Sequence, residues 1–355
     1  MTVSRACARA PVRVDPAGGG TDAPPFVTEH GGFVVNFGVE RYAYAAVERL
    51  GAGEGVMIYA LDLERGVTAD SSDQLPDGDP LEFVKAFVRR LVPAGESLVL
   101  TTEADVPPGS GLGGSGALGV AVVAALDRAF GQERTANETA ALANEIERHD
   151  LGYPGGSQDS FGSALGGMNL LEHRHDGSTV PHRLRVPTAT RFEIERSSLL
   201  IYPGAAHVSG DIHHDIRAAY ETEGSATRTA MFQLRESAQR MAKALEGGDI
   251  AGYLNELNSS CDSLYRLHSS CDSEAHRELL RGLGDSILGR KTCGAGGGGF
   301  LMVHSRPGRR AECIRQAEAG GAMVWPLTID DRGVVSWDEP PSGPEEIARL
   351  RQAVG

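Results

Sequence analysis

PPGSGLGGSGAL, residues 107–118, decides how the rest of this sequence is interpreted. A strand is expected before it, over 96–106, and an apolar helix after it, to about Phe130. A glycine-rich turn between a strand and a helix presents several backbone N–H groups at the positive end of the helix dipole, and glycine lets a phosphate approach closely. Ser110 and Ser115 add hydroxyl groups, one of which could ligate a magnesium ion. The segment is therefore predicted to hold nucleotide phosphates.

Other interpretations of this loop remain open. It could be a flexible surface loop, or it could bind a dinucleotide, because 109–114 and 111–116 both match GxGxxG. A dinucleotide-binding unit needs a second strand after the helix, whereas here another helix is expected from Thr135, where Thr135 and Glu138 form a capping box. GDSILGRKT (284–292) is one residue longer than a Walker A motif and lies in the reverse order, after a helix and before a strand.

Bulk composition narrows the classes of partner. The 355 residues carry a net charge of −14, which disfavours binding to nucleic acid or to an anionic membrane and favours a small-molecule partner. Five cysteines without a CxxC pair indicate neither a disulfide framework nor a zinc site. No apolar run approaches the roughly 20 residues of a membrane helix, and the N-terminus does not resemble a signal peptide. A cytoplasmic protein, monomeric or homodimeric, is expected.

The pattern of elements predicts an α+β fold of two domains, 1–190 and 191–355. Strands are expected over 34–50 and 192–204, and a short helix and a strand within 152–173. Helical periodicity covers 79–93, 209–223, 226–246 and most of 250–288, and 291–305 is interpreted as a glycine turn that leads into a strand.

Two further glycine-rich segments accompany the central loop. PVRVDPAGGGTD (11–22) is expected to be a strand that ends in a tight turn, where backbone can lie very close to a ligand. CGAGGGGF (293–300) lies near the other end of the chain and, taken alone, is no more specific than a bulged strand or a linker.

Together, the three segments resemble the GHMP kinase superfamily, whose central motif Pro-x-x-x-Gly-Leu-Gly-Ser-Ser-Ala appears here as PPGSGLGGSGA from Pro107. The resemblance covers about residues 11–300. PVRVDPAGGGTD and GGSQDSFGSALGGMNLLEH (155–173) are most similar to the D-glycero-D-manno-heptose 7-phosphate kinase branch, to which fucokinases are closely related. It implies a two-domain fold, with ATP and the acceptor in the cleft between the domains and transfer to a hydroxyl, expected at C1 of the sugar.

The resemblance also implies roles for individual residues. Asp159 would accept the proton of the acceptor hydroxyl, and Arg13 would orient Asp159 and keep it ionised. Mg²⁺ would be held by Ser115 and Glu147. The ATP-binding residues would be Pro107, Gly109, Ser110, Gly111, Leu112, Gly113, Gly114, Ser115 and Gly116. The acceptor-binding residues would be Gly19, Gly20, Thr21, Asp22, Gly156, Gln158, His207, Gly296 and Gly297.

Alternatives to these roles come from the residues themselves. Asp159 could instead cap a helix, and Arg13 could pair structurally with Asp15 or Asp159 without a catalytic role. Glu147 could be a solvated helix residue, since Glu145 is also available on the same predicted helix.

The sequence departs from the family pattern in two places. Gly114 replaces the first serine of the pair, and His207 stands where an arginine is usual. If that arginine binds a distal phosphate, the acceptor could be a C7-cyclitol phosphate or a free, fucose-type sugar. His213 and His214 could assist phosphate binding or be solvated. A non-catalytic nucleotide-binding protein remains the alternative of another class.

Overall fold

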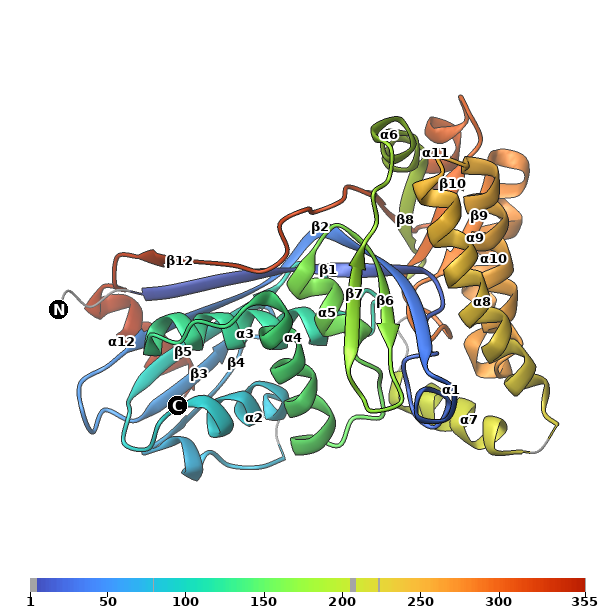
Figure 1. Cartoon of the computed structure of the whole chain (residues 1–355). Coiled ribbons are helices and arrows are strands. Elements are labelled where there is room, and N and C mark those ends of the chain that lie inside the picture. Colours follow the sequence, from blue (N-terminus) through green and yellow to red (C-terminus); the bar gives the residue numbers. More distant parts are fainter. Residues whose placement is uncertain (1–4, 79, 205–208, 223, 355) are drawn as a thin grey trace.

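The computed structural model of the chain describes residues 5–78, 80–204, 209–222 and 224–354 (Figure 1). Its strands are β1 (Arg5–Ala17), β2 (Gly32–Arg49), β3 (Val56–Ala60), β4 (Arg65–Ala69), β5 (Leu98–Ala104), β6 (Met168–His173), β7 (Thr179–Arg183), β8 (Ser198–Tyr202), β9 (Ile287–Thr292), β10 (Leu301–Ser305), β11 (Met323–Pro326) and β12 (Val335–Glu339).

Helices separate most of these strands. They are α1 (Phe26–His30), α2 (Glu82–Leu91), α3 (Gly114–Phe130), α4 (Ala136–Glu145), α5 (Gln158–Leu165), α6 (Thr188–Ser197), α7 (Ser209–Glu221), α8 (Ala226–Glu246), α9 (Ile250–Tyr265), α10 (Glu274–Leu283), α11 (Arg310–Ala319) and α12 (Pro344–Val354). Single turns are η1 (Ser72–Gln74), the π-helical η2 (Ile146–Asp150), η3 (Ser269–Cys271) and η4 (Gly284–Ser286).

The strands form two sheets. The larger has eight strands in the order β12-β1-β2-β5-β3-β4, and β6 and β7 extend from the far end of the long strand β2. Its apolar face packs against α2, α3, α4 and α5. The last strand of the chain, β12, pairs antiparallel with β1 beside α12 (Figure 1). Both ends of the described chain therefore lie on the larger sheet.

The smaller sheet has the order β11-β8-β10-β9 and is antiparallel throughout. Helices α8 and α9 pack between one face of this sheet and the ends of β1 and β2, and α10 and α11 cover the other face. The core shared by β1, β2, α8, α9 and the smaller sheet places the 293–300 turn, at the end of β9, beside the turn that follows β1. This packing creates the cleft described below.

Most predicted elements are confirmed. Helix α8 has the bounds expected from its periodicity, and the capping box at Thr135 and Glu138 is present at the start of α4. The α+β fold class is confirmed as well. Residues 284–292 form η4 and β9 and lack the strand–loop–helix order of a Walker A motif. Within the described ranges, no helix combines the length and hydrophobicity needed to cross a lipid bilayer.

One predicted element is wrong. The strand expected over 192–204 begins only at Ser198, because Thr188–Ser197 is the helix α6. The alternation of apolar and polar side chains from Phe192 suggested a strand, but Phe192 points to solvent and only one large apolar side chain, Ile194, is buried on α6. An i,i+4 ion pair between Arg191 and Glu195 stabilises the helix. Local helix-forming interactions therefore outweighed the strand-like pattern.

Candidate functional site

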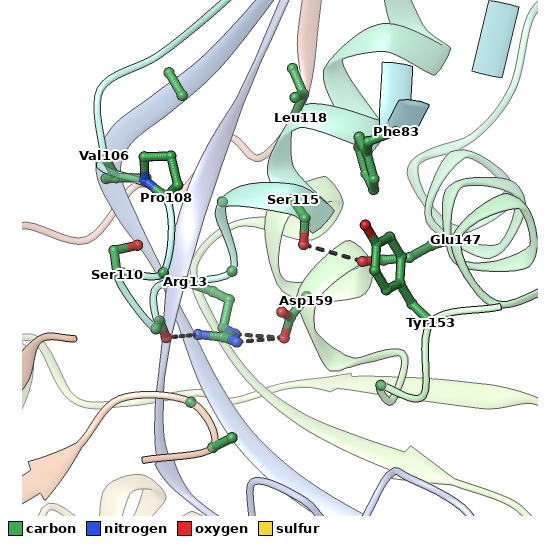
Figure 2. Close-up of a pocket in the computed structure, with 18 of the residues that line it drawn as sticks. Arg13, Phe83, Val106, Pro108, Ser110, Ser115, Leu118, Glu147, Tyr153 and Asp159 are labelled. Carbon is green, nitrogen blue, oxygen red and sulfur yellow. Dashed lines mark hydrogen bonds and ion pairs between the residues drawn. The ribbon is translucent and has the colours of Figure 1, made fainter. Parts of the chain in front are cut away.

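A cavity of about 550 Å³ opens where the two sheets approach each other. Its walls come from the turn after β1, the β5–α3 loop, η2, the start of α5, α7 and the 293–300 turn. Figure 2 shows Arg13, Ser115, Glu147 and Asp159 pointing toward one another across this space. Segments far apart in the sequence thus meet in one cavity.

The central loop has the backbone conformation that its glycines predict. Gly109, Gly111 and Gly113 all have φ between 70° and 76°, which side-chain-bearing residues rarely adopt, and α3 begins immediately at Gly114. A Cβ on Gly111 would lie 2.5 Å from the carbonyl oxygen of Cys293. The first residues of α3, Gly114 and Ser115, line the cavity, so the N-terminus of the helix lies at it, after a loop that packs too closely for larger residues.

The three glycine-rich segments converge on this cavity. The Phe300 amide donates to the Ser110 carbonyl oxygen (2.8 Å), which joins the 293–300 turn to the central loop. The Gly294 amide donates to Asp15 Oδ1 (2.8 Å), which joins the same turn to the last residues of β1, within the 11–22 segment. Long-range hydrogen bonds thus assemble what the sequence shows only as separate motifs.

Arg13 and Asp159 form the polar centre of the site. Arg13 donates from Nε (2.8 Å) and Nη2 (2.6 Å) to Oδ1 of Asp159, and from Nη1 to the Gly111 carbonyl oxygen (2.6 Å). Within the described residues Oδ2 of Asp159 accepts no hydrogen bond, so this oxygen is free to accept a proton. A Cβ on Gly116 would lie 2.6 Å from the Asp159 Cβ, so glycine at 116 lets α3 and α5 pack closely.

Burial changes the basicity of this carboxylate. Burial raises the pKa of Asp159 above its usual range, and the adjacent Arg13 guanidinium opposes that shift. The net direction is upward, so Asp159 is a stronger base than an exposed aspartate. Asp159 lies in the first turn of α5, but its oxygens accept no helix N–H within the described residues, and Arg13 pairs with Asp159 and not with Asp15.

Ser115 and Glu147 lie beside this pair. The Ser115 hydroxyl donates to Glu147 Oε1 (3.1 Å), and Figure 2 shows the two side chains meeting above Asp159. Burial, together with the negative charge of Asp159, raises the pKa of Glu147 to about 7. Two hard oxygen donors, of which the Glu147 carboxylate has no cation partner among the described residues, fit a Mg²⁺ ion. The described residues hold no cluster of three ligating side chains, so such an ion would take its other ligands from phosphate and water.

Glu145, the alternative to Glu147, points elsewhere. Its Oε1 accepts from Arg90 Nη2 (2.7 Å) at the surface, and it does not line the cavity. The π-helical turn η2 begins directly after Glu145 and contains Glu147, which it places on the cavity side.

The turn after β1 meets the start of α5 at the end of the cavity that contains Asp22 and Gln158. The Gln158 amide donates to Asp22 Oδ2 (3.0 Å), and a Cβ on Gly156 would overlap the Asp22 carboxylate. Gln158 lines the cavity, and its buried Oε1 has no hydrogen-bond partner. An acceptor hydroxyl could supply that missing donor.

Several residues expected at the site do not reach the cavity. Thr21 is fully buried, and its hydroxyl donates to the carbonyl oxygen of Gly18 and accepts from the Phe33 amide. The other residues that do not line the cavity are Leu112, Gly116, Gly296 and Gly297. Their space is filled by neighbouring protein, which gives them a packing role. His207 lies outside the described residues.

An apolar wall at the far side of the central loop is not predictable from sequence patterns alone. Phe83, at the start of α2, faces Tyr153 with ring centroids 6.4 Å apart, and Leu63, Val106 and Leu118 complete this wall. The expected helix over 79–93 contained Phe83, but its periodicity assigns apolar residues to the core without showing which of them borders a ligand site.

A buried ion pair holds the 293–300 turn in place. Lys291 Nζ lies 3.5 Å from Asp15 Oδ2 and donates to the Thr292 carbonyl oxygen (2.5 Å). Both side chains are about 1% exposed. Because Asp15 also accepts from Gly294, the pair connects the end of β1 with β9 of the smaller sheet and with the turn that follows it.

We expect Lys291→Met to destabilise the protein by about 3–5 kcal/mol, because it leaves the Asp15 carboxylate buried without its cation. Urea unfolding followed by circular dichroism measures the change. Lys243→Met removes an exposed lysine from α8 and is the matched control, with an expected change below about 0.5 kcal/mol. The double variant Asp15→Asn/Lys291→Met should recover part of the loss. Equal stability of the two single lysine variants would contradict the proposed contribution of the pair.

Comparison with known proteins shows similarity to sugar kinases over most of the chain. Residues 81–167 match the family described as GHMP kinases N terminal domain. The chain is 27% identical to D-glycero-alpha-D-manno-heptose 7-phosphate kinase of Campylobacter jejuni, over 92% of this chain and 97% of that protein. It is 26% identical to the L-fucokinase/L-fucose-1-P guanylyltransferase of Bacteroides fragilis, over 92% of this chain and 38% of that longer protein.

Solved structures of kinases have the same fold as this chain. A D-glycero-D-manno-heptose 1-phosphate kinase from Bacteroides thetaiotaomicron superposes with a TM-score of 0.77 at 27% identity, over 94% of this chain and 98% of that one. Mevalonate kinase of Methanococcus jannaschii, at 11% identity over 91% of this chain and 98% of that one, has a TM-score of 0.71 and shows a shared fold alone. The similarity expected from the three glycine-rich segments is therefore confirmed.

Proposed function

Since residues 81–167 belong to the GHMP kinase N-terminal domain family, we propose that this chain is an ATP-dependent kinase that transfers the γ-phosphate to the C1 hydroxyl of a heptose 7-phosphate-like sugar. The enzyme is a phosphotransferase that acts on a sugar hydroxyl. The observation that carries the proposal is the Arg13–Asp159 pair beside the N-terminus of α3. This arrangement provides a proton acceptor next to a phosphate-binding loop.

The nucleotide phosphates would lie against the N–H groups at the start of α3 and in the loop 109–113. Mg²⁺, held by Ser115 and Glu147, would neutralise charge on the triphosphate. The adenine would lie against the apolar wall that contains Phe83, because this wall adjoins the phosphate loop on the side away from Asp159.

The acceptor would lie between Asp22, Gln158 and Asp159. Oδ2 of Asp159 takes the proton of the acceptor hydroxyl as that oxygen forms its bond to the γ-phosphorus. The bond between the γ-phosphorus and the β–γ bridging oxygen breaks, and ADP leaves with the electron pair. Arg13 fixes the carboxylate through Oδ1, so the free oxygen keeps its orientation during the transfer. A partly enclosed cavity limits the access of water, which would compete as an acceptor.

A coupled ADP-release assay tests this function on a panel of acceptors. The panel contains heptose 7-phosphate, unphosphorylated heptose, fucose and a C7-cyclitol phosphate, and phosphorus NMR of the product identifies the modified hydroxyl. We expect the highest kcat/KM with heptose 7-phosphate and a new anomeric phosphate signal. The likeness to the Bacteroides fragilis enzyme makes a free-sugar kinase the second candidate, and preference for fucose would establish it. No ADP release with any acceptor would contradict both.

We expect Phe83→Ala to raise the KM for ATP roughly 10-fold, because stacking of a base on an aromatic ring contributes about 1–3 kcal/mol. The KM for the acceptor should stay within twofold. Phe192→Ala is the matched control, since Phe192 is 63% exposed on α6 and does not line the cavity. If the two variants have the same KM for ATP, the adenine lies elsewhere.

A further inference from the structure

A second cavity adjoins the first between Gly20, beside the proposed acceptor site, and Tyr153, which also faces Phe83 of the apolar wall. Its volume is about 590 Å³, and it lies between α1, η2, α7 and α8. The two cavities share five lining residues, namely Gly20, Tyr153, Pro154, His213 and Ile216. A ligand whose reactive hydroxyl lies at Asp159 could therefore extend past His213 into the second cavity.

The charges around this second cavity are all of one sign. Arg148 and Arg217 line it together with three histidines, and no aspartate or glutamate is among its lining residues. The chain as a whole carries a net charge of −14. The cavity is otherwise lined mainly by apolar residues, so a set of charged residues that are all basic is a local feature that the overall composition does not explain, and it favours an anion.

Neither of the two arginines forms a strong ion pair within the protein, so both guanidinium groups can bind an anionic ligand. Arg148 is half-buried and makes no hydrogen bond or ion pair with any described residue. Arg217 Nε contacts Glu221 Oε1 (3.1 Å), but this is an exposed i,i+4 pair of the kind that contributes little. Acidic side chains on the neighbouring elements already have partners, and Asp215 of α7 faces His268. Glu29 of α1 accepts from Tyr220 and Arg228, and Asp150 of η2 faces Arg90.

The π-helical turn η2 explains how adjacent residues serve two cavities. Glu147 lines the first cavity, and Arg148 and His149 line the second. A π-helical turn is rare and is often found at functional sites. Here it places a carboxylate on the Mg²⁺ side and a guanidinium on the acceptor side within two consecutive residues.

We propose that the second cavity binds the distal phosphate of the acceptor, with Arg148 and Arg217 as its principal ligands and His213 at the junction between the two cavities. This inference rests on the proposed kinase function and adds the residues that distinguish a sugar phosphate from a free sugar. Guanidinium groups suit this purpose because they stay charged and can donate two hydrogen bonds to one phosphate.

We expect Arg148→Ala and Arg217→Ala each to raise the KM for heptose 7-phosphate about 10- to 100-fold, because each removes charge-assisted hydrogen bonds. The KM for ATP, and the activity with unphosphorylated heptose, should stay within twofold. Arg148→Lys should recover part of the loss. Arg281→Ala, an exposed arginine of α10 that lines neither cavity, is the matched control and should behave as wild type.

Calorimetric titration separates this inference from the kinase function itself. Wild-type protein without nucleotide should bind heptose 7-phosphate more tightly than heptose, and Arg148→Ala should abolish that difference whether or not phosphate is transferred. Inorganic phosphate should compete with heptose 7-phosphate and not with ATP.

Two outcomes would overturn the inference. Equal losses with phosphorylated and unphosphorylated sugar would show a structural role for the arginines. Inhibition by inorganic phosphate that is not competitive with the acceptor would make the cavity a separate effector site.

Discussion

Asp159→Asn should lower kcat roughly 10²- to 10⁴-fold, which is the range that a positioned general base contributes. Asparagine has nearly the same shape as aspartate, so the hydrogen bonds from Arg13 to the Oδ1 position can persist while the proton acceptor is lost. ATP binding should be unchanged, because the phosphate loop is held by backbone contacts that do not involve the carboxylate. Steady-state kinetics and calorimetric titration with a nonhydrolysable ATP analogue measure the two quantities.

Asp330→Asn is the matched control for this substitution. Asp330 is more deeply buried than Asp159, at 4% exposed against 26% for the Asp159 side chain, and it accepts hydrogen bonds from Tyr42 and two backbone amides without lining the cavity. The Asp330→Asn substitution should lower the free energy of unfolding, and the folded fraction of the variant should retain kcat close to that of the wild type. Wild-type turnover of Asp159→Asn would remove Asp159 from the role of proton acceptor and leave positioning as the source of catalysis.

The central loop shows how much of the site local sequence could predict. A strand, closely spaced glycines and an apolar helix are local features, so both the conformation of residues 109–113 and the start of α3 follow from them. The pairing of Arg13 with Asp159 spans 146 residues and was reached through the family resemblance, because no spacing rule connects these positions.

The residues that were missed depend on tertiary packing. The role of Lys291 depends on its ion pair with Asp15, and these two residues come from distant segments that meet only in the folded chain. Arg148 next to Glu147 looks like an ordinary charged helix residue until the π-helical turn directs the two side chains into different cavities. The rarity of lysine in this arginine-rich chain was the one available signal for Lys291.

Glu147→Gln should reduce kcat/KM by at least about 10- to 100-fold at saturating ATP and physiological Mg²⁺, since even residues that only orient metal ligands have effects of that size. In the wild type, activity should rise with pH through about 7, the pKa to which burial raises Glu147. Added Mg²⁺ should move that midpoint to lower pH, because a metal favours the ionised carboxylate. Kinetics across pH at several Mg²⁺ concentrations measure both effects.

Although Glu147→Gln should lower activity, it should increase the stability of the ligand-free protein at high pH. The folded protein holds the Glu147 proton up to a pH of about 7, whereas glutamate in the unfolded chain releases it near its ordinary pKa of 4.5. The unfolded state therefore binds fewer protons between these values, so the native glutamate destabilises the ligand-free fold progressively as pH rises through this window. Glu147→Gln should consequently raise the urea midpoint at pH 8 and leave it nearly unchanged at pH 4. Glu145→Gln, at the exposed neighbouring carboxylate, should alter neither activity nor this pH dependence. If Glu147→Gln is no more stable than wild type at pH 8, burial does not destabilise the ionised carboxylate of Glu147. The hydrogen bond with Ser115 would then account for the position of the Glu147 side chain.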